Sequence, residues 1–190
     1  MDKKFLLRLL KDRLSEKKYK HTIGVAETAV KLAKIYSVDE EKAYFAGLLH
    51  DITKELSPKE QMDFCIDYKI ELDFVEKNEP KVLHQHTGAY YVRYLLNIED
   101  EEIVRAVRYH TTANKYMTEL DKIIYIADCV EPNRTYDGVE EIRQALEEKG
   151  LDFAMLTALR SSIIEVAKKG TLLHPDTIEA YNVFVENQKN

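Results

Sequence analysis

Cysteine is scarce in this chain of 190 residues, and its scarcity argues against stabilisation by disulfide bonds or by a cysteine-bound zinc ion. The two cysteines, Cys65 and Cys129, lie far apart in the sequence, and neither belongs to a CxxC pair. A disulfide framework or a thiolate zinc site needs more cysteines at closer spacing. Unpaired thiols are typical of a reducing compartment, so we expect a cytoplasmic protein.

Glycine, proline and long apolar runs are also in short supply. No Pro/Gly/Ser-rich stretch marks a linker, and a chain of this length with 45% hydrophobic residues can bury one sizeable core. We therefore predict one domain over residues 1–190. No run approaches the ~20 apolar residues of a membrane span, and the N-terminus lacks the pattern of a signal peptide. Hence we expect no membrane partner.

The chain has no block of basic residues. Its net charge is -6, and acidic and basic residues are interleaved along it. This pattern argues against an extended nucleic-acid surface, although it leaves room for a local phosphate site.

Helical spacing of apolar residues runs through nearly the whole chain, and alternating strand patterns are missing. The sequence thus predicts an all-α fold, a helical bundle. Residues 69–80 are ambiguous. The expected helices cover residues 3–14, 20–36, 39–50, a segment starting at 57, and then about 81–97, 100–110, 119–130, 138–148, 152–169 and 176–187.

Several helix ends carry specific signals. Ser57-Pro58-Lys59-Glu60 combines a capping box with proline at the first helical position, and Asp39 is a candidate N-cap. Gly150 and Gly170 stand where C-terminal caps belong, and Pro175 stands near the start of the last helix.

The residues that carry chemistry follow the order H…HD…H…H…D along the chain. Four imidazoles and two carboxylates supply enough ligands for two metal ions if the fold brings them together. These six candidate ligands are His21, His50, Asp51, His84, His110 and Asp128.

Helical period places these polar groups on apolar faces, where ligands between helices must lie. His21 begins a stripe that includes Val25 and Leu32, and Asp128 follows Leu120 and Ile124 at helical spacing. Any one of the histidines, taken alone, is better read as a core residue with one hydrogen bond. Buried aspartates are rarer, and six such groups in one small domain favour a metal site.

Two histidines compete for one position in Leu83-His84-Gln85-His86. Residues two apart on a helix do not share a face. His84 shares its line with Gly88 and Leu95, whereas His86 lines up with polar positions. The period therefore selects His84 as the inward-facing ligand.

At this point the motifs resemble a known family, the HD-domain metal-dependent phosphohydrolases. The finer pattern is similar to the YqeK-type branch, the symmetrical diadenosine tetraphosphate hydrolases. The resemblance covers about residue 17 to residue 182. The segments that carry it are Lys20–Val25, Leu49–Lys54, Leu83-His84 with Gly88-Ala89, Tyr109–Thr111, Ile126–Arg134, His174–Thr177 and Tyr181-Asn182.

The resemblance implies a fold, a ligand assignment and a reaction. It implies an HD core of about residues 17–134, with C-terminal helices at 138–187 packed on it. His21, His50, Asp51 and Asp128 would hold one ion, and His84, His110 and a bridging Asp51 the other. The implied reaction splits diadenosine tetraphosphate into two ADP, with a metal-bridging hydroxide as the nucleophile.

The ligand types restrict the metal. Mixed imidazole and carboxylate ligation favours iron, manganese, cobalt, nickel or zinc over magnesium, which prefers oxygen ligands. Iron is the metal that the family implies.

Four further residues are candidates for contacts with the substrate. Lys54 and Arg134 follow the ligands Asp51 and Asp128 and can bind phosphate, the arginine as a bidentate fork. Thr111 and His174 are weaker candidates. Glu131 either ends its helix or supports a ligand from behind.

Other functions remain open at this stage. The chain could be another HD nucleotidase or phosphodiesterase. It could instead be a non-catalytic nucleotide-sensing or RNA-associated module, although the complete ligand set argues against loss of catalysis. The expected partner is a nucleotide substrate, and a homodimer is the working hypothesis for the oligomeric state.

Overall fold

The protein is described by a computed structural model that covers residues 2–189, and these residues form helices and no strands. None of the helices combines the length and the apolar character that crossing a bilayer requires. The prediction of an all-α fold is confirmed. In chain order the elements are α1 (Lys3–Arg13), α2 (Glu16–Ile35), α3 (Glu40–Leu49), α4 (Pro58–Asp67), α5 (Phe74–Asn78), η1 (Pro80–Val82), α6 (His84–Tyr90), η2 (Tyr91–Leu95), α7 (Glu101–Tyr109), α8 (Glu119–Val130), α9 (Val139–Lys149), α10 (Leu151–Lys169) and α11 (Pro175–Asn187).

The helix-start signals of the sequence form the hydrogen bonds expected of them. The Asp39 side chain accepts from two backbone N–H groups of α3. Ser57 and Glu60 form both halves of a capping box at α4. Such caps satisfy backbone donors that have no partner inside the helix. Pro175 is the first residue of α11, and Gly150 and Gly170 stand at helix ends with positive φ.

Two segments depart from the expected pattern. Part of the ambiguous stretch 69–80 is the short helix α5, which begins because Asp73 and Glu76 form a second capping box. The helix expected over about 81–97 is present within two or three residues of its expected ends, but it is not uniform. A 3₁₀ turn precedes it, the α-helix α6 continues directly into the π-helical turn η2, and the turn ends before Asn97, whose φ is +51°.

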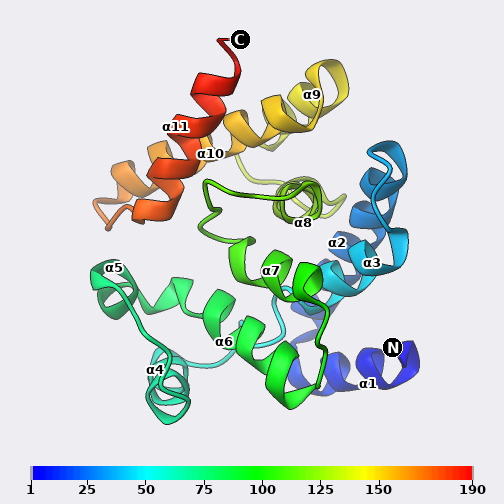
Figure 1. Ribbon diagram of the computed structural model, residues 1–190, viewed down its shortest axis with the longest axis vertical. Helices are drawn as coiled ribbons and strands as arrows, with labels where there is room; N and C mark the ends of the chain where they lie inside the picture. Colours follow the sequence, from blue (N-terminus) through cyan, green and yellow to red (C-terminus); the bar gives the residue numbers. More distant parts are fainter. Residues whose placement is uncertain (1, 190) are drawn as a thin grey trace.

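Helix α8 occupies the middle of the molecule and is seen nearly end-on in Figure 1. It packs against α2, α3 and α7 on one side and against α9 and α10 on the other. Its central residues are fully buried, as an apolar helix in the middle of a bundle must be. Any polar side chain that α8 contributes to this interior therefore needs a partner there.

Helices α2 and α3 approach each other closely, and the approach depends on Gly47. A Cβ atom placed on Gly47 would lie 2.8 Å from the Cα atom of Ala26 and 3.2 Å from its backbone nitrogen. These atoms belong to the backbone of α2 and cannot move aside without moving the helix. The position therefore excludes every side chain and fixes α3, which leads into His50, against α2.

We predict that Gly47→Ala lowers the free energy of unfolding by about 1–3 kcal/mol, because the added methyl group forces the two helices apart. Chemical denaturation at constant metal content measures the change. Gly88→Ala is the matched control, since its Cβ would meet its nearest neighbours, Thr53 and Val107, only at 3.4 Å. Equal losses in both variants would show that close packing at Gly47 is not the cause.

Candidate metal centre

The structure brings all six predicted ligands into one cluster between five helices. His21 belongs to α2, and His50 and Asp51 follow the end of α3. His84 begins α6, His110 follows the end of α7, and Asp128 belongs to α8. All but Asp128 are buried, and the side chain of Asp128 is 21% exposed. The cluster thus lies in the interior and opens to solvent beside Asp128.

Asp51 stands in the middle and presents one oxygen to each of two histidine pairs. Its Oδ2 atom lies 3.9 Å from His21 Nε2 and 3.4 Å from His50 Nε2. Its Oδ1 atom lies 3.4 Å from His84 Nε2 and 3.4 Å from His110 Nε2. The carboxylate is therefore shared by two groups of donors, His21 with His50 and His84 with His110.

Three of the four imidazoles are oriented by the backbone. The Nδ1 atom of His50 lies 2.6 Å from the carbonyl oxygen of Gly47, three residues earlier. His84 and His110 make the corresponding bonds of 2.7 Å, again to the residue three before. Because a carbonyl oxygen can only accept, each Nδ1 must carry the proton. Each Nε2 therefore directs a lone pair into the cluster, which is the tautomer that binds metal.

The acceptors at the centre of this cluster outnumber the donors that reach them from Lys18, Lys54, Thr111 and Arg134. His50 Nε2 and Asp51 Oδ1 are buried without any hydrogen-bond partner. The Nε2 atoms of His84 and His110 face each other at 3.0 Å although both have their protons on Nδ1. Facing lone pairs and orphaned buried acceptors are costly unless a cation lies among them. The residues present therefore fit a site for divalent metal.

Asp128 completes the group on the side of His21. Its Oδ1 atom lies 3.0 Å from His21 Nε2 and 3.8 Å from His50 Nε2. The Arg134 guanidinium binds the same oxygen and also donates from Nε to the Asp128 carbonyl oxygen at 2.7 Å. Arg134 thus turns back over the end of α8 toward the cluster.

Burial and the central carboxylate set the protonation of the imidazoles. Burial lowers the pKa of His110 and holds the pKa of His84 well below its usual range. Burial would also lower the pKa of His50, but the charge of Asp51 outweighs it and raises that pKa. Neutral imidazoles are the form that ligates metal, so His84 and His110 are prepared for ligation near neutral pH.

The two aspartates remain ionised. Burial would raise the pKa of Asp51, but the neighbouring His50 and Lys54 hold it well below its usual range. Burial opposes ionisation of Asp128 as well, and the neighbouring His21 and Arg134 keep its pKa low. Both carboxylates can therefore supply negative charge to bound cations.

Two lysines lie at the cluster, one expected from the sequence and one not. Lys54 Nζ lies 2.9 Å from His84 Nε2 and 3.9 Å from Asp51 Oδ1. Lys18 was missed, and its Nζ lies 2.8 Å from Asp51 Oδ2. The signal for Lys18 was its place three residues before His21, on the same face of α2. Cations thus approach both oxygens of the central carboxylate.

Glu131 fills both roles that the sequence left open, since α8 ends at the residue before it and its side chain supports a ligand. Its Oε1 atom lies 3.1 Å from His21 Nδ1, and the residue is 1% exposed. Its Oε2 atom accepts from the Asn133 backbone and side chain at 2.8 and 2.9 Å. A buried carboxylate behind a metal-facing histidine orients the ring and strengthens it as a ligand. Glu131 therefore does for His21 what a backbone carbonyl does for the other three.

Gly24 makes room for this carboxylate. A Cβ atom on Gly24 would lie 2.5 Å from Glu131 Oε2. The segment Lys20–Val25 therefore contains both the ligand and the space that its partner needs.

A cavity of about 570 Å³ opens beside the cluster. Its lining includes Lys54, His110, Thr111, Asp128 and Arg134, which lie at the metal cluster, and further residues of α8, α9, α10 and the segment between α8 and α9. Thr111 Oγ1 lies 2.9 Å from His84 Nε2 and 3.0 Å from His110 Nε2. Three of the four expected substrate contacts, namely Lys54, Thr111 and Arg134, therefore share one cavity with the metal ligands.

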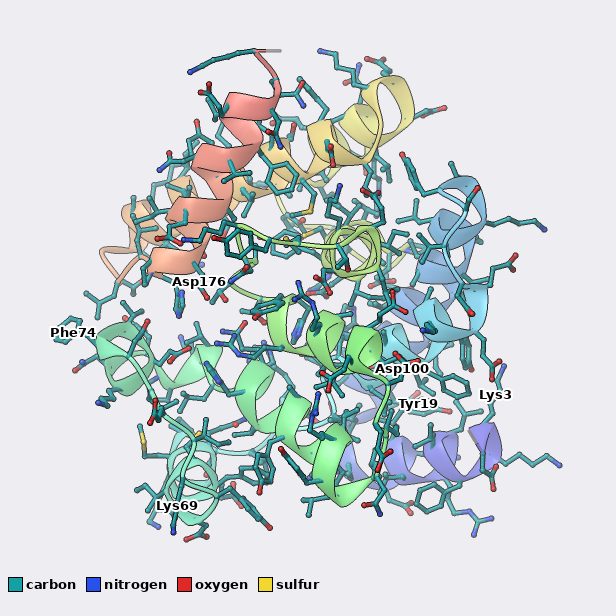
Figure 2. The ribbon with its side chains drawn as sticks, in the orientation of Figure 1. Lys3, Tyr19, Lys69, Phe74, Asp100 and Asp176 are labelled. Carbon is teal, nitrogen blue, oxygen red and sulfur yellow. The ribbon has the colours of Figure 1, made fainter. Side chains whose placement is uncertain are left out.

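The fourth expected contact, His174, lies elsewhere, in a second polar cluster. Its Nε2 atom lies 3.3 Å from Glu76 Oε1 and 3.5 Å from Asp73 Oδ2. His86 binds the same Glu76 oxygen, and Arg108 lies 3.4 Å from it. His86 thus faces away from the metal cluster, but onto this buried cluster rather than onto solvent. Glu76 belongs to α5, whose first residue, Phe74, is exposed and points out of the molecule (Figure 2).

Comparison with known proteins assigns the family. The model of the HD domain family matches residues 19–133. The "Bis(5'-nucleosyl)-tetraphosphatase, symmetrical" of Halalkalibacterium halodurans is 40% identical over 96% of this chain and 97% of its own length. The protein of the same name from Bacillus subtilis is 37% identical over 97% and 98%.

A solved structure shows the same fold. It belongs to a predicted HD superfamily hydrolase involved in NAD metabolism from Clostridium acetobutylicum, with a TM-score of 0.94 and 38% identity over 98% of both chains. The chain therefore belongs to the HD domain family. The family resemblance inferred from the spacing of histidines and aspartates is confirmed.

We predict that His84→Ala removes metal, whereas His86→Ala retains the full metal content and loses stability instead. His84 directs Nε2 into the metal cluster, but His86 donates to buried Glu76, which loses a partner at a cost of about 1–3 kcal/mol. Elemental analysis and chemical denaturation of both variants separate the two effects. Loss of metal from the His86 variant would contradict this assignment.

A second prediction concerns Glu131. Glu131→Ala should weaken metal binding by about 10–100-fold, because His21 loses the group that orients its ring. Glu131→Gln should restore part of the affinity, since an amide oxygen still accepts from Nδ1. Competition with a chelator of known affinity measures both variants, and equal affinity in the alanine variant and the wild type would show that Glu131 does not support the ligand.

Proposed function

We propose that this protein hydrolyses a dinucleoside tetraphosphate symmetrically, with diadenosine tetraphosphate giving two ADP. One observation carries the proposal: four imidazoles aim Nε2 at a shared buried carboxylate, beside a cavity with cationic side chains at the same end. The relatives named symmetrical tetraphosphatases span nearly the full chain and support the choice of substrate.

Two divalent ions fit the two donor groups that share Asp51. His21, His50 and Asp128 would hold one ion, and His84 and His110 the other, with Asp51 between them. Such ions supply Lewis-acid activation of water and neutralise charge on phosphoryl oxygens. We infer iron from the family resemblance, with manganese, cobalt, nickel and zinc as the other metals that suit this ligand set.

The chain itself positions the phosphates. Arg134 lies at the cavity with its guanidinium on Asp128, so a phosphate beside that ligand meets a planar fork. Lys54 offers a point charge on the side of His84. The Thr111 hydroxyl lies between His84 and His110 and can donate to an oxygen placed there. These groups bind and orient the tetraphosphate so that its central anhydride faces the metal ligands.

The oligomeric state and the cellular location are separate from the proposed activity. A homodimer and a cytoplasmic location stay predictions from the sequence, and the activity requires neither.

We predict that the metal-loaded protein converts diadenosine tetraphosphate to ADP as the sole nucleotide product, and that a chelator abolishes turnover. Asp51→Asn should lower kcat by at least about a hundredfold, because an amide lacks the charge that two cations share. Asp63→Asn, at the surface of α4, is the matched control. Product chromatography separates ADP from the AMP and ATP of asymmetric cleavage.

The same assay contains the outcomes against the proposal. AMP with ATP as products would overturn symmetrical cleavage. Tight nucleotide binding without turnover at full metal content would favour a nucleotide sensor. Wild-type rates in the Asp51 variant would show that this carboxylate is not shared by two ions.

A further inference from the structure

We propose that Tyr136 stacks on the nucleobase of one half of the substrate, in the cavity beside the metal centre. This inference rests on the proposed function and deepens it, because it assigns the nucleoside a place and an orientation. The observations are the spacing of Tyr136 from Arg134, the anchoring of its ring, and the distribution of charge in the cavity.

Tyr136 lies close to Arg134 in the sequence. Tyr136 follows Arg134 by two residues in a segment without helix, between α8 and α9, and both line the cavity. Two residues of extended chain span at most about 7 Å. A nucleotide whose phosphate binds Arg134 therefore carries its sugar and base past Tyr136.

The ring of Tyr136 is anchored at one edge and open elsewhere. Its hydroxyl donates to the carbonyl oxygen of Cys129 at 3.0 Å, next to the ligand Asp128. The residue is nevertheless 40% exposed. A tyrosine whose polar end is bound while its ring stays accessible is a rigid platform with two rotatable bonds already fixed. Stacking on such a ring costs little conformational entropy and suits a planar base.

Charge orients the substrate in the cavity. Lys54 and Arg134 lie against the metal ligands, so the tetraphosphate is drawn there. The rest of the charged lining opposes phosphate, because Glu165 and Asp137 outnumber Lys169, which is paired with Glu165 at 2.9 Å. The uncharged nucleoside is therefore left for the part of the lining that carries Tyr136, the neighbour of Asp137 in the sequence.

The size of the cavity suits a nucleotide. Its volume of about 570 Å³ lies in the range of pockets for single small-molecule ligands.

The test compares ligands with and without a nucleoside. Binding of ADP and of inorganic diphosphate to the metal-loaded protein is measured by calorimetry for the wild type, Tyr136→Leu and Tyr136→Phe. The leucine variant should lose about tenfold or more in affinity for ADP, with diphosphate affinity unchanged. The phenylalanine variant keeps the ring and should stay close to the wild type. Tyr116→Leu is the control, since Tyr116 is 72% exposed and lies outside the cavity.

Kinetics provide the second readout. Tyr136→Leu should raise KM for diadenosine tetraphosphate by a similar factor and leave kcat within about threefold, because stacking acts on the nucleoside and not on the scissile bond. An unchanged ratio of ADP to diphosphate affinity in the leucine variant would overturn the inference, even if the enzyme turns over normally. An equal loss for both ligands would also overturn it, by showing damage to the phosphate end. Absence of turnover in the wild type would contradict the proposed function. The ratio of ADP to diphosphate affinity would still test whether Tyr136 contacts the nucleobase.

Discussion

The buried carboxylate of Asp51 is the constraint on which this structure depends. A carboxylate removed from water is costly unless positive charge or several donors surround it. Here Lys18 and Lys54 supply positive charge, and four imidazoles turn Nε2 toward the carboxylate. In His84 and His110 this nitrogen carries a lone pair, which adds an acceptor rather than a proton. Divalent cations in the cluster would bind the carboxylate and these lone pairs together, and the polar interior of the bundle is arranged to hold them.

One local hydrogen bond orients three of the four histidine ligands. His50 and His110 each follow the last residue of a helix, where carbonyl groups have no partner inside the helix. Each ring donates Nδ1–H to the carbonyl three residues before, and His84 repeats the geometry at a 3₁₀ turn. The same bond satisfies a helix end and selects the metal-binding tautomer. Placing ligands at helix ends thus combines a backbone requirement with a chemical one.

The sequence predicted the parts of the site that follow from helical period, and it missed those that depend on packing between helices. The inward faces of His21, His84 and Asp128 follow from spacing alone. Lys18 could have been found in the same way, because it shares the face of His21. The partnership of Glu131 with His21 could not, since it joins residues 110 positions apart and requires the space left by Gly24. The change from α-helix to π-helix at Tyr91–Leu95 has no signal in the helical pattern.

The second cluster shows why histidines beside carboxylates are not by themselves a metal site. Asp73, Glu76 and His174 lie close enough together to suggest one. However, His174 Nδ1 accepts from the backbone N–H of Asp176 at 3.2 Å, as the N-cap of α11. The proton of the neutral ring must then be on Nε2, where it is donated to Glu76. This ring has no lone pair left for a cation, so the cluster binds α11 to α5 by hydrogen bonds. The backbone group at Nδ1 thus distinguishes the two clusters. In His50, His84 and His110 Nδ1 donates to a carbonyl oxygen, which leaves the lone pair on Nε2, whereas in His174 Nδ1 accepts from an amide, which leaves the proton on Nε2.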